Sequence, residues 1–417
     1  MKHTITFKDH TISLDFGLVG ILVLFAITSF ISIYSAFNLI KDGNGISYLG
    51  KQMMWYCIGF VVLFFITSIQ NQVIYKYVRK FYNILMVCLV YLLISSLMIR
   101  ITGNTNIHLP FAPSINGAVS WFRFPIIGSF QPSEFIKIVL IIMTAQTIKE
   151  HQDRYPDPTW HEDLKLLFEI AKIYLPPLIL IFLQPDTGLC IIIAFNALVL
   201  LMCSGIRKKY IITLFVFIGF VVGLFFFLYF QHPEILSKFI SAYRLQRIEA
   251  WLDPESHITG SSNQLYTALL SLGSAGLTGY GLQANIIGIP EAHTDFIFAA
   301  IGQSFGIIGT TFILLICLLL DGYLCKIAYN IKNKVDRFVV IGIIAMLLYQ
   351  QLQNLGMIVG LLPITGITLP LISYGGSSIL SYFIAFALVM NVSPLSKNTI
   401  NLSKKTKLKK HFKKVRV

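Results

Sequence analysis

The stretch from Tyr210 to Phe230 reads YIITLFVFIGFVVGLFFFLYF and holds 21 residues without a charged side chain. A helix of about 20 apolar residues is long enough to cross the roughly 30 Å hydrocarbon core of a bilayer. Arg207, Lys208 and Lys209 directly precede the stretch, and such cations are typical of the cytoplasmic end of a membrane helix. The stretch therefore predicts a transmembrane helix.

The rest of the chain has the same character. Of its 417 residues, 55% are hydrophobic and 12% are charged, and the mean hydropathy is +0.73. Soluble proteins carry about 25% charged residues, so the composition excludes a soluble globular enzyme and a disordered chain. It predicts an all-α integral membrane protein with about ten transmembrane helices. Their expected limits are 16–36, 52–69, 81–99, 131–148, 172–185, 188–204, 210–230, 295–321, 338–362 and 368–392.

The orientation of these helices follows from the positions of Lys and Arg. With the N-terminus inside, 25 of the 33 cations fall on inner segments, 7 fall on outer segments, and Lys137 lies within a span. This asymmetry predicts that both termini are cytoplasmic. It also places two long loops, about 100–131 and 231–294, on the extracytoplasmic side, and long loops commonly carry function.

The net charge of +14 has a local source. Nine cations lie in residues 397–417, which contain no acid. A basic tail directly after an apolar run predicts contact with anionic lipid at the cytoplasmic face, and nucleic-acid binding is not expected. We expect two units, a membrane domain at 1–396 and this tail. The six cysteines form no C-x-x-C pair, so neither a disulfide framework nor a zinc site is indicated.

Among the charged residues within or next to predicted spans, four are candidates for a structural or functional role. Glu134 and Lys137 are three residues apart, which puts both on one helix face. They are expected either to form a structural ion pair or to line a polar cavity, since lone charges in a bilayer are costly. Asp186 and Asp295 lie at outer ends of spans, where Asp commonly caps free N–H groups, so capping or packing is expected for each.

The second long loop contains the most informative polar stretch, residues 243–255. Arg244 and Arg247 share one face of a short predicted amphipathic helix, and the guanidinium fork suits phosphate or pyrophosphate. Asp253 stands before a proline, which ends the helix. Its carboxylate could act as a general base or simply form an Asp-Pro turn. Composition does not separate it from three other carboxylates, Glu249, Glu255 and Glu291.

Residues 273–281, Gly-Ser-Ala-Gly-Leu-Thr-Gly-Tyr-Gly, are rich in glycine. A phosphate-binding loop would need a strand before it and a helix after it, and that setting is missing. The stretch instead predicts a hairpin at the membrane surface, where two backbones approach closely.

Six stretches stand in a series along the chain: 117–121 (Gly-Ala-Val-Ser-Trp), 131–134 (Gln-Pro-Ser-Glu), 184–186 (Gln-Pro-Asp), 247–255 (ending Asp-Pro-Glu), 290–299 (Pro-Glu-Ala-His-Thr-Asp-Phe-Ile-Phe-Ala) and 369–378 (Leu-Pro-Leu-Ile-Ser-Tyr-Gly-Gly-Ser-Ser). In order and spacing, the series resembles the SEDS proteins (shape, elongation, division and sporulation), the group of RodA, FtsW and SpoVE. The resemblance covers all ten predicted spans. The run at 121–124 and the basic tail look most like the RodA branch.

The resemblance implies a peptidoglycan glycosyltransferase of the bacterial cytoplasmic membrane, which polymerises lipid II at the outer face beside a class B penicillin-binding protein. Asp253 matches the catalytic base proposed for the family. Arg244 and Arg247 become candidates for the leaving pyrophosphate. Glu291, His293 and Asp295, in the fifth stretch, become substrate-binding candidates. A divalent cation, Mg²⁺ or Mn²⁺, is a candidate aid, with no ligands assigned by the sequence.

Two other functions stay open. A flippase for lipid II would use Glu134, Lys137 and Asp186 as a polar path, although no inverted repeat is evident. The second open function is a non-catalytic scaffold that positions the transpeptidase. It is kept open by Gln303, which stands where the family usually has Glu. Smaller departures are Ser120, where a basic residue is common, and Ala275, where Gly is common. The sequence does not separate elongation, division and sporulation.

Overall fold

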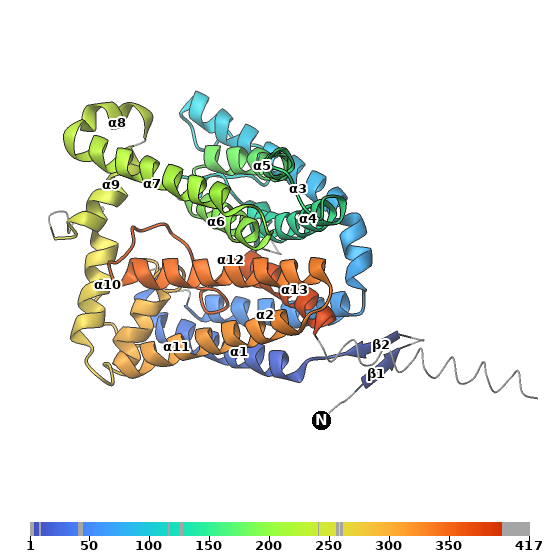
Figure 1. The fold of residues 1–417 in the computed structure, drawn as a ribbon. Coiled ribbons are helices and arrows are strands. Elements are labelled where there is room, and N and C mark those ends of the chain that lie inside the picture. Colours follow the sequence, from blue (N-terminus) through green and yellow to red (C-terminus); the bar gives the residue numbers. More distant parts are fainter. Residues whose placement is uncertain are drawn as a thin grey trace, which may run out of the picture.

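The computed structural model describes residues 4–7, 10–40, 45–115, 117–124, 128–240, 242–255, 258 and 262–393. Within them, ten helices overlap the ten predicted spans (Figure 1). They are α1 (Phe16–Ser35), α2 (Gly45–Thr67), α3 (Asn71–Thr102), α4 (Pro132–Arg154), α5 (Trp160–Leu183), α6 (Thr187–Cys203), α7 (Lys208–Gln231), α11 (Ile297–Asn330), α12 (Lys334–Ile358) and α13 (Gly376–Val392). The helices α3 and α5 begin 10 and 12 residues before the predicted limits, and α11 ends nine residues after its own. The predicted basic tail lies outside the described residues.

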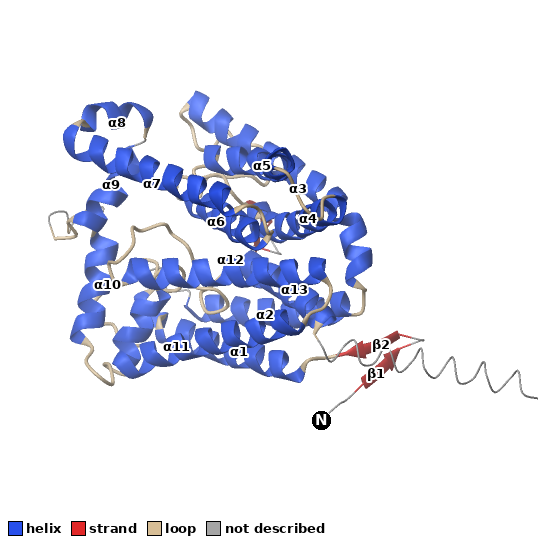
Figure 2. Cartoon of the chain, in the orientation of Figure 1, coloured by secondary structure: helices blue, strands red, loops and turns tan. Residues whose placement is uncertain are grey.

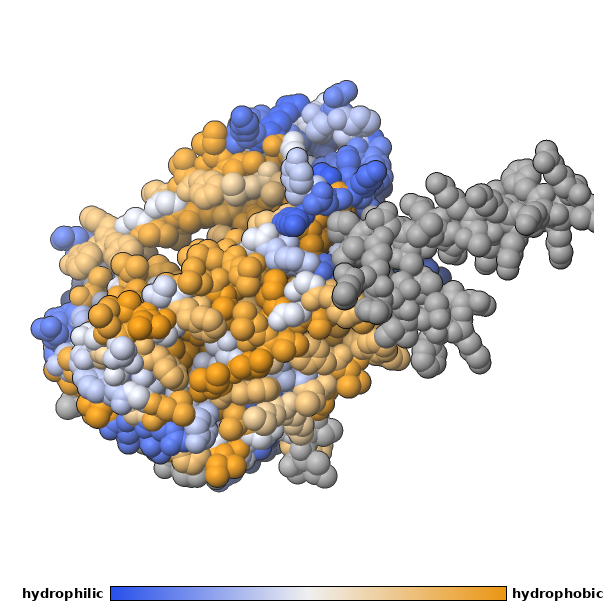
Figure 3. Space-filling view, turned by 90° about the horizontal axis from the view of Figure 1, so that it is seen from below, coloured by the Kyte–Doolittle hydropathy of each residue, from blue (hydrophilic) through white to orange (hydrophobic). Residues whose placement is uncertain are grey.

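Seven of these helices, all but α4, α6 and α13, are long and apolar enough to cross a membrane. The helices α6 and α13 are shorter, with 17 residues each, and α4 carries charged residues at both ends. Hydrophobic side chains cover the middle of the face shown in Figure 3, and hydrophilic ones gather toward its ends. The helical membrane class is thus confirmed, while the direction in which each helix crosses stays a prediction.

Figure 2 shows the strands β1 and β2 standing apart from the helical bundle, while the other small elements connect the long helices. The second long loop is largely helical, with α8 (Pro233–Phe239), α9 (Ala242–Leu252) and α10 (Asn263–Ser274). The helix α9 confirms the short amphipathic helix predicted there. Two short antiparallel hairpins, β1 (Thr4–Phe7) with β2 (His10–Ser13) and β3 (Phe122–Phe124) with β4 (Gly128–Phe130), and the single-turn helix η1 (Phe37–Leu39) were not predicted.

The helices α4, α12 and α13 form the centre of the bundle. They pack against one another, α6 packs against α4 and α12, and α2 packs against α13. Large side chains such as Phe383 and Phe386 of α13 are fully buried. The helix α7 is the opposite case, because no side chain of it is buried. An apolar helix without buried residues presents its surface to lipid, in agreement with the uncharged sequence at 210–230.

The tenth predicted span begins too early, at residue 368 rather than at Gly376. Residues 368–375 form a loop because their hydrogen bonds leave the helical pattern. The N–H of Leu369 donates to the Ser373 hydroxyl at 2.9 Å, and the N–H of Tyr374 donates to the carbonyl of His293 at 2.9 Å. Pro370 has no N–H to donate to a helical ladder. This apolar segment is therefore held against the loop that precedes α11.

The glycine-rich stretch 273–281 does bring two backbones close together, as predicted. The helix α11 is broken at Gly306, whose φ is +60° and ψ is −150°. Across the break, Tyr280 and Gly281 donate to the carbonyls of residues 303 and 304 at 2.9 and 3.0 Å. A Cβ atom on Gly279 would lie 2.4 Å from the carbonyl carbon of Ser304. Only glycine fits at position 279, because any side chain would collide with the backbone of Ser304. The predicted span 295–321 did not include this break in the helix.

Gln303, the residue that departs from the family pattern, is fully buried beside this break. Its Nε2 donates to the Ser271 hydroxyl at 2.7 Å and to the carbonyl of Ile287 at 2.9 Å. Its Oε1 accepts from the N–H of Ile286 at 2.9 Å. One amide thereby joins α10, α11 and the loop between them, which is a structural role.

The variant Gln303→Glu is expected to lower the free energy of unfolding by about 1–3 kcal/mol, since a carboxylate cannot donate to the buried carbonyl and hydroxyl. Thermal unfolding in detergent would measure the loss. Gln231→Glu, at the exposed end of α7, makes the same change and should alter stability by less than about 0.5 kcal/mol. Equal stability of both variants would show that the amide's donor is dispensable.

Candidate active site

Four segments meet at the end of the bundle that lies opposite the N-terminal strands (Figure 1). They are the turn between α5 and α6, the end of α9, the loop before α11 and the loop between α12 and α13. The turn is tight, because α5 ends at Leu183 and α6 begins at Thr187, which confirms the predicted hairpin. The predicted site residues from the second long loop lie in or next to these segments.

The helix α9 is fastened to the loop between α12 and α13 by two side chains. The indole N–H of Trp251 donates to the carbonyl of Gly360 at 3.0 Å. The guanidinium Nη1 of Arg247 donates to the carbonyl of Ile364 at 3.4 Å. The side chain of the predicted Arg244 lies outside the described residues. The Arg247 guanidinium points toward the bundle, where it reaches the carbonyl of Ile364.

Asp253 follows the last residue of α9 directly. Its N–H donates to the carbonyl of Glu249 at 2.9 Å, which continues the helical pattern by one residue. The residue is exposed, so its carboxylate is accessible from outside the bundle. Because Trp251 fixes α9 two residues earlier, the position of Asp253 is set by the docking of that helix.

Arg247 and Asp295 face the same point of the loop between α12 and α13. A Cβ atom added to Gly366 would lie 3.3 Å from Oδ2 of Asp295 and 3.7 Å from Nη1 of Arg247. Gly366 has a φ of +71°, which favours glycine. Asn354 of α12 holds the surrounding backbone, because its Nδ2 donates to the carbonyls of Asp295 and Ile367, each at 2.7 Å.

Asp295 does not cap α11, contrary to one of the two expectations for it. The capping position is taken by Phe296, which makes no side-chain capping bond. Burial raises the pKa of Asp295 to about 7, the carboxylates of Glu291 and Asp186 add to the rise, and the Arg247 guanidinium opposes it. Asp295 is therefore close to half protonated at neutral pH.

This raised pKa predicts a pH-dependent difference between the protein and its Asp295→Asn variant. In the unfolded chain the carboxyl ionises near pH 4, so its contribution to stability is complete at low pH and is lost as the pH rises toward about 7. The neutral amide has no such loss. Thermal unfolding should therefore favour the variant increasingly between pH 5 and pH 8, and a pH-independent difference would contradict the prediction.

Asp186 caps the start of α6, which confirms the capping role that was one of the two predicted for it. Its Oδ1 accepts from the N–H of Leu189 in the first turn of α6 at 3.3 Å. Its Oδ2 accepts from the side-chain amide of Gln131 at 2.9 Å. Gln131 directly precedes α4, so the bond ties the start of α4 to the start of α6 at the candidate site.

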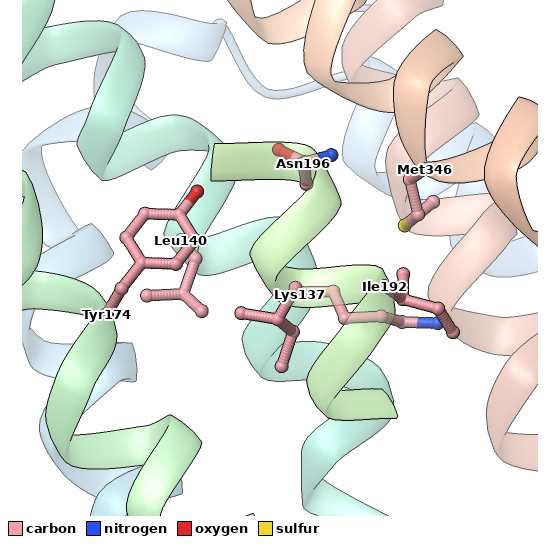
Figure 4. A pocket seen from close by; sticks show the side chains of 7 residues that line it. Lys137, Leu140, Tyr174, Ile192, Asn196 and Met346 are labelled. Atoms are coloured by element: carbon pink, nitrogen blue, oxygen red, sulfur yellow. The ribbon is translucent and has the colours of Figure 1, made fainter. Parts of the chain in front are cut away.

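Glu134 and Lys137 form an ion pair one turn into α4. The Lys137 Nζ lies 2.9 Å from Oε2 of Glu134, and the side chains are 2% and 7% exposed. Figure 4 shows Lys137 beside Leu140, Ile192 and Met346. The void between these residues is too small to hold water. These surroundings favour the ion-pair interpretation over a polar cavity.

His293 and Glu291 lie in the loop before α11 and have different surroundings. The His293 ring packs against the rings of Tyr48 and Tyr374, at centroid distances of 4.5 and 5.9 Å. Glu291 is exposed, and its Oε2 accepts from the Thr294 hydroxyl at 2.9 Å. The φ of Glu291 is +52°, an uncommon value for a residue other than glycine.

The described residues contain no ready-made cluster of side chains for a divalent cation. Among them no three His, Cys, Asp or Glu side chains are grouped closely enough to hold one. The ligands that Mg²⁺ and Mn²⁺ prefer are carboxylate oxygens, and here these are dispersed or committed to capping and pairing. No chemical step is assigned to a metal.

Three residues at this end were not singled out from the sequence: Trp251, Asn354 and Gly366. The first two carried a readable signal. An indole in a polar amphipathic helix, and an amide in an apolar span, each require a hydrogen-bond partner. Gly366 carried no signal in the sequence, because its contact with Arg247 and Asp295 exists only after the chain has folded.

Together these features define a polytopic membrane protein with charged and amide side chains at one end of its helical bundle. The family model for cell cycle proteins of the FtsW, RodA and SpoVE group matches residues 12–398. The chain therefore belongs to this family, the SEDS proteins.

Individual relatives agree with this assignment. The stage V sporulation protein E of Bacillus subtilis is 32% identical, over 92% of this chain and 98% of that protein. A probable peptidoglycan glycosyltransferase FtsW of Geobacter metallireducens is 31% identical, over 92% of this chain and 96% of that protein. The branch within the family stays a prediction.

Solved structures share the fold. A structure described as a peptidoglycan synthase complex that coordinates polymerization and crosslinking superimposes with a TM-score of 0.67 at 25% identity, over 90% of this chain and 96% of that one. The Thermus thermophilus rod shape determining protein RodA gives a TM-score of 0.60 at 24% identity, over 90% and 95%. The latter likeness shows the fold alone.

Proposed function

We propose that this protein is a peptidoglycan glycosyltransferase that polymerises lipid II into glycan strands. The family membership and the relatives named as such enzymes support the proposal. The observation that carries it is the exposed Asp253 carboxylate at the end of α9, a helix held by Trp251 and carrying the partly buried Arg247, which approaches Asp295 at Gly366. A reactive group held next to ordered charges is what a transfer site requires.

In the proposed reaction, Asp253 accepts the proton of the 4-hydroxyl on the acceptor sugar. The oxygen then attacks the anomeric carbon of the donor and forms the new glycosidic bond with inversion. The bond to the polyprenyl pyrophosphate breaks, and the pyrophosphate leaves with the electron pair. Arg247 is the described cation nearest to Asp253 along α9, and its guanidinium is our candidate to stabilise the negative charge that develops.

The substrate itself explains why such a site belongs at one end of a helical bundle. A lipid-linked sugar keeps its tail in the bilayer and its sugars and pyrophosphate in the polar layer. We place the site on the extracytoplasmic face of the bacterial cytoplasmic membrane, as the distribution of cations predicts. A class B penicillin-binding protein that cross-links the product is the proposed partner, supported by the likeness to a synthase complex.

Polymerisation of lipid II by the purified protein tests the proposal. The expected result is glycan chains formed by wild-type protein, measured with and without the candidate partner and with and without Mg²⁺ or Mn²⁺. A parallel assay in liposomes scores movement of labelled lipid II. Transport without polymerisation would favour a flippase, and neither activity with retained partner binding would favour a scaffold.

A further inference from the structure

A polar cavity lies at the other end of the bundle from the candidate active site. It has a volume of about 310 Å³ and is lined by α3, α4 and α5, which pack against one another at one corner of the bundle (Figure 1). The helix α4 joins the two places, with Glu134 near one and Arg154 at the other. Over the 22 residue steps from Pro132 to Arg154, a helix covers about 33 Å, close to the thickness of the hydrocarbon core.

The lining of this α3–α5 cavity carries charges of both signs. Three cations, Arg79, Arg154 and Lys172, face it together with two carboxylates, Glu150 and Glu169. The salt bridges found among the described residues lie elsewhere, at residues 134 and 137, 149 and 153, and 163 and 207. The five charged groups around the cavity are thus not neutralised by pairing within this part of the chain.

Aromatic side chains hold the lining of the cavity in place. The guanidinium of Arg79 lies over the ring of Tyr82, 5.5 Å from its centroid. The hydroxyl of Tyr82 donates to the carbonyl of Ile173 at 3.0 Å, which joins α3 to α5. The His151 ring stands against Tyr155 at 5.2 Å, so the wall from α4 is packed as well.

An apolar stripe begins at the cavity and runs along the exposed face of α5 toward the C-terminal end of that helix. Leu175 and Ile179 follow Lys172 by three and seven residues, so they lie on the same helix face. They are 53% and 55% exposed, and Phe182 extends the stripe with 50%. On this helix face the cation of Lys172 suits the phosphate of a lipid headgroup, and the row of exposed apolar side chains suits an acyl chain.

We propose that the α3–α5 cavity binds the headgroup of a phospholipid in the leaflet opposite the candidate active site. The phosphodiester contacts Arg79, Arg154 and Lys172, since basic pockets between membrane helices suit such groups. Glu150 and Glu169 accept hydrogen bonds from a donor beyond the phosphate, a glycerol hydroxyl or an ethanolamine ammonium. One acyl chain lies along the stripe on α5. This inference does not depend on the proposed enzymatic activity.

The chemistry of the lining predicts a ranking among lipids. Phosphatidylglycerol and phosphatidylethanolamine both carry a donor beyond the phosphate, whereas phosphatidylcholine carries none. Purified full-length protein, stripped of lipid and exposed to an equal mixture of the three, should retain the first two at least about tenfold over the third, as observed by native mass spectrometry. Equal retention of all three would overturn the proposal.

A double variant locates the site. Arg154→Gln with Lys172→Gln should lower the retention of the two preferred lipids about tenfold. Lys208→Gln with Lys326→Gln removes the same charge from exposed positions outside the cavity and should change retention less than about twofold. Unchanged retention by the first double variant would overturn the proposal. The lipid ranking of the wild type remains decisive if that variant fails to fold.

A free phosphate compound is distinguished from a lipid in the same experiment. Glycerol 3-phosphate offers a phosphate and hydroxyls but no acyl chain. At a concentration equal to that of the lipids it should not displace them, because it gains nothing from the apolar stripe. Displacement by glycerol 3-phosphate at that concentration would assign the cavity to a soluble phosphate ligand instead.

Discussion

The Asp253→Asn variant is expected to polymerise lipid II about 10²–10⁴-fold more slowly than the wild type, because its amide cannot accept the proton of the attacking hydroxyl. The side chain is exposed, and Asn is nearly the same size, so the fold should be unaffected. Chain length and rate, measured on gels with labelled lipid II, would report the loss. Size-exclusion profiles and partner binding should match those of the wild type.

Neighbouring carboxylates supply the matched controls. Glu249→Gln and Glu255→Gln make the same chemical change at exposed positions in or just after α9, and both should retain activity within a few-fold. Substantial synthesis by the Asp253 variant would remove Asp253 as the base. An equal loss in the Glu255 variant would transfer that role to the second carboxylate. Retained cell-wall function with no synthesis would favour a scaffold.

The second large effect concerns stability and the ion pair within α4. The Lys137→Met variant should lower the free energy of unfolding by about 3–5 kcal/mol, because it leaves the Glu134 carboxylate buried without its cation. The Glu134 side chain is 7% exposed, and its other described contact is the Ser381 hydroxyl at 3.3 Å. Methionine fills a space already lined by Leu140, Ile192 and Met346, so lost packing contributes little.

The double variant Lys137→Met with Glu134→Gln distinguishes the effect of an unpaired buried charge from the effect of changed packing. Replacing both members of a buried ion pair by neutral groups is often close to neutral for stability, so most of the loss should be recovered. Thermal unfolding of the wild type, the single variant and the double variant in one detergent measures the coupling. If the single variant is as stable as the wild type, the pair contributes only to function.

Much of the fold could be predicted from local sequence. A bilayer imposes one length and one polarity on every spanning helix, so apolar runs such as 210–230 coincide with helices. The boundaries were less certain, and the first residue of α13 was missed because the segment before it is equally apolar. Its loop geometry depends on a bond from Tyr374 to His293, a residue 81 positions earlier that no local pattern reveals.

The candidate site was predictable in its residue types and not in its arrangement. Glu134 and Lys137 meet through helical spacing, so their pairing was foreseeable. Arg247 and Asp295 lie 48 residues apart and approach each other only at Gly366. The break in α11 likewise depends on Gly279 meeting Gly306 across two segments. Such contacts arise when segments that are distant in the sequence pack together. A single sequence does not show how close these segments lie in the folded chain.

By itself, the sequence determined that the chain is a helical membrane protein, where its spans lie and to which family its motifs point, because hydropathy and spacing act over one or two helical turns. The tertiary structure alone decided which side chains share a site, that Gln303 serves packing, and that three helices line a charged cavity far from Asp253. The physical reason is that burial and electrostatic contact depend on distances in space, and these are fixed only when the helices pack.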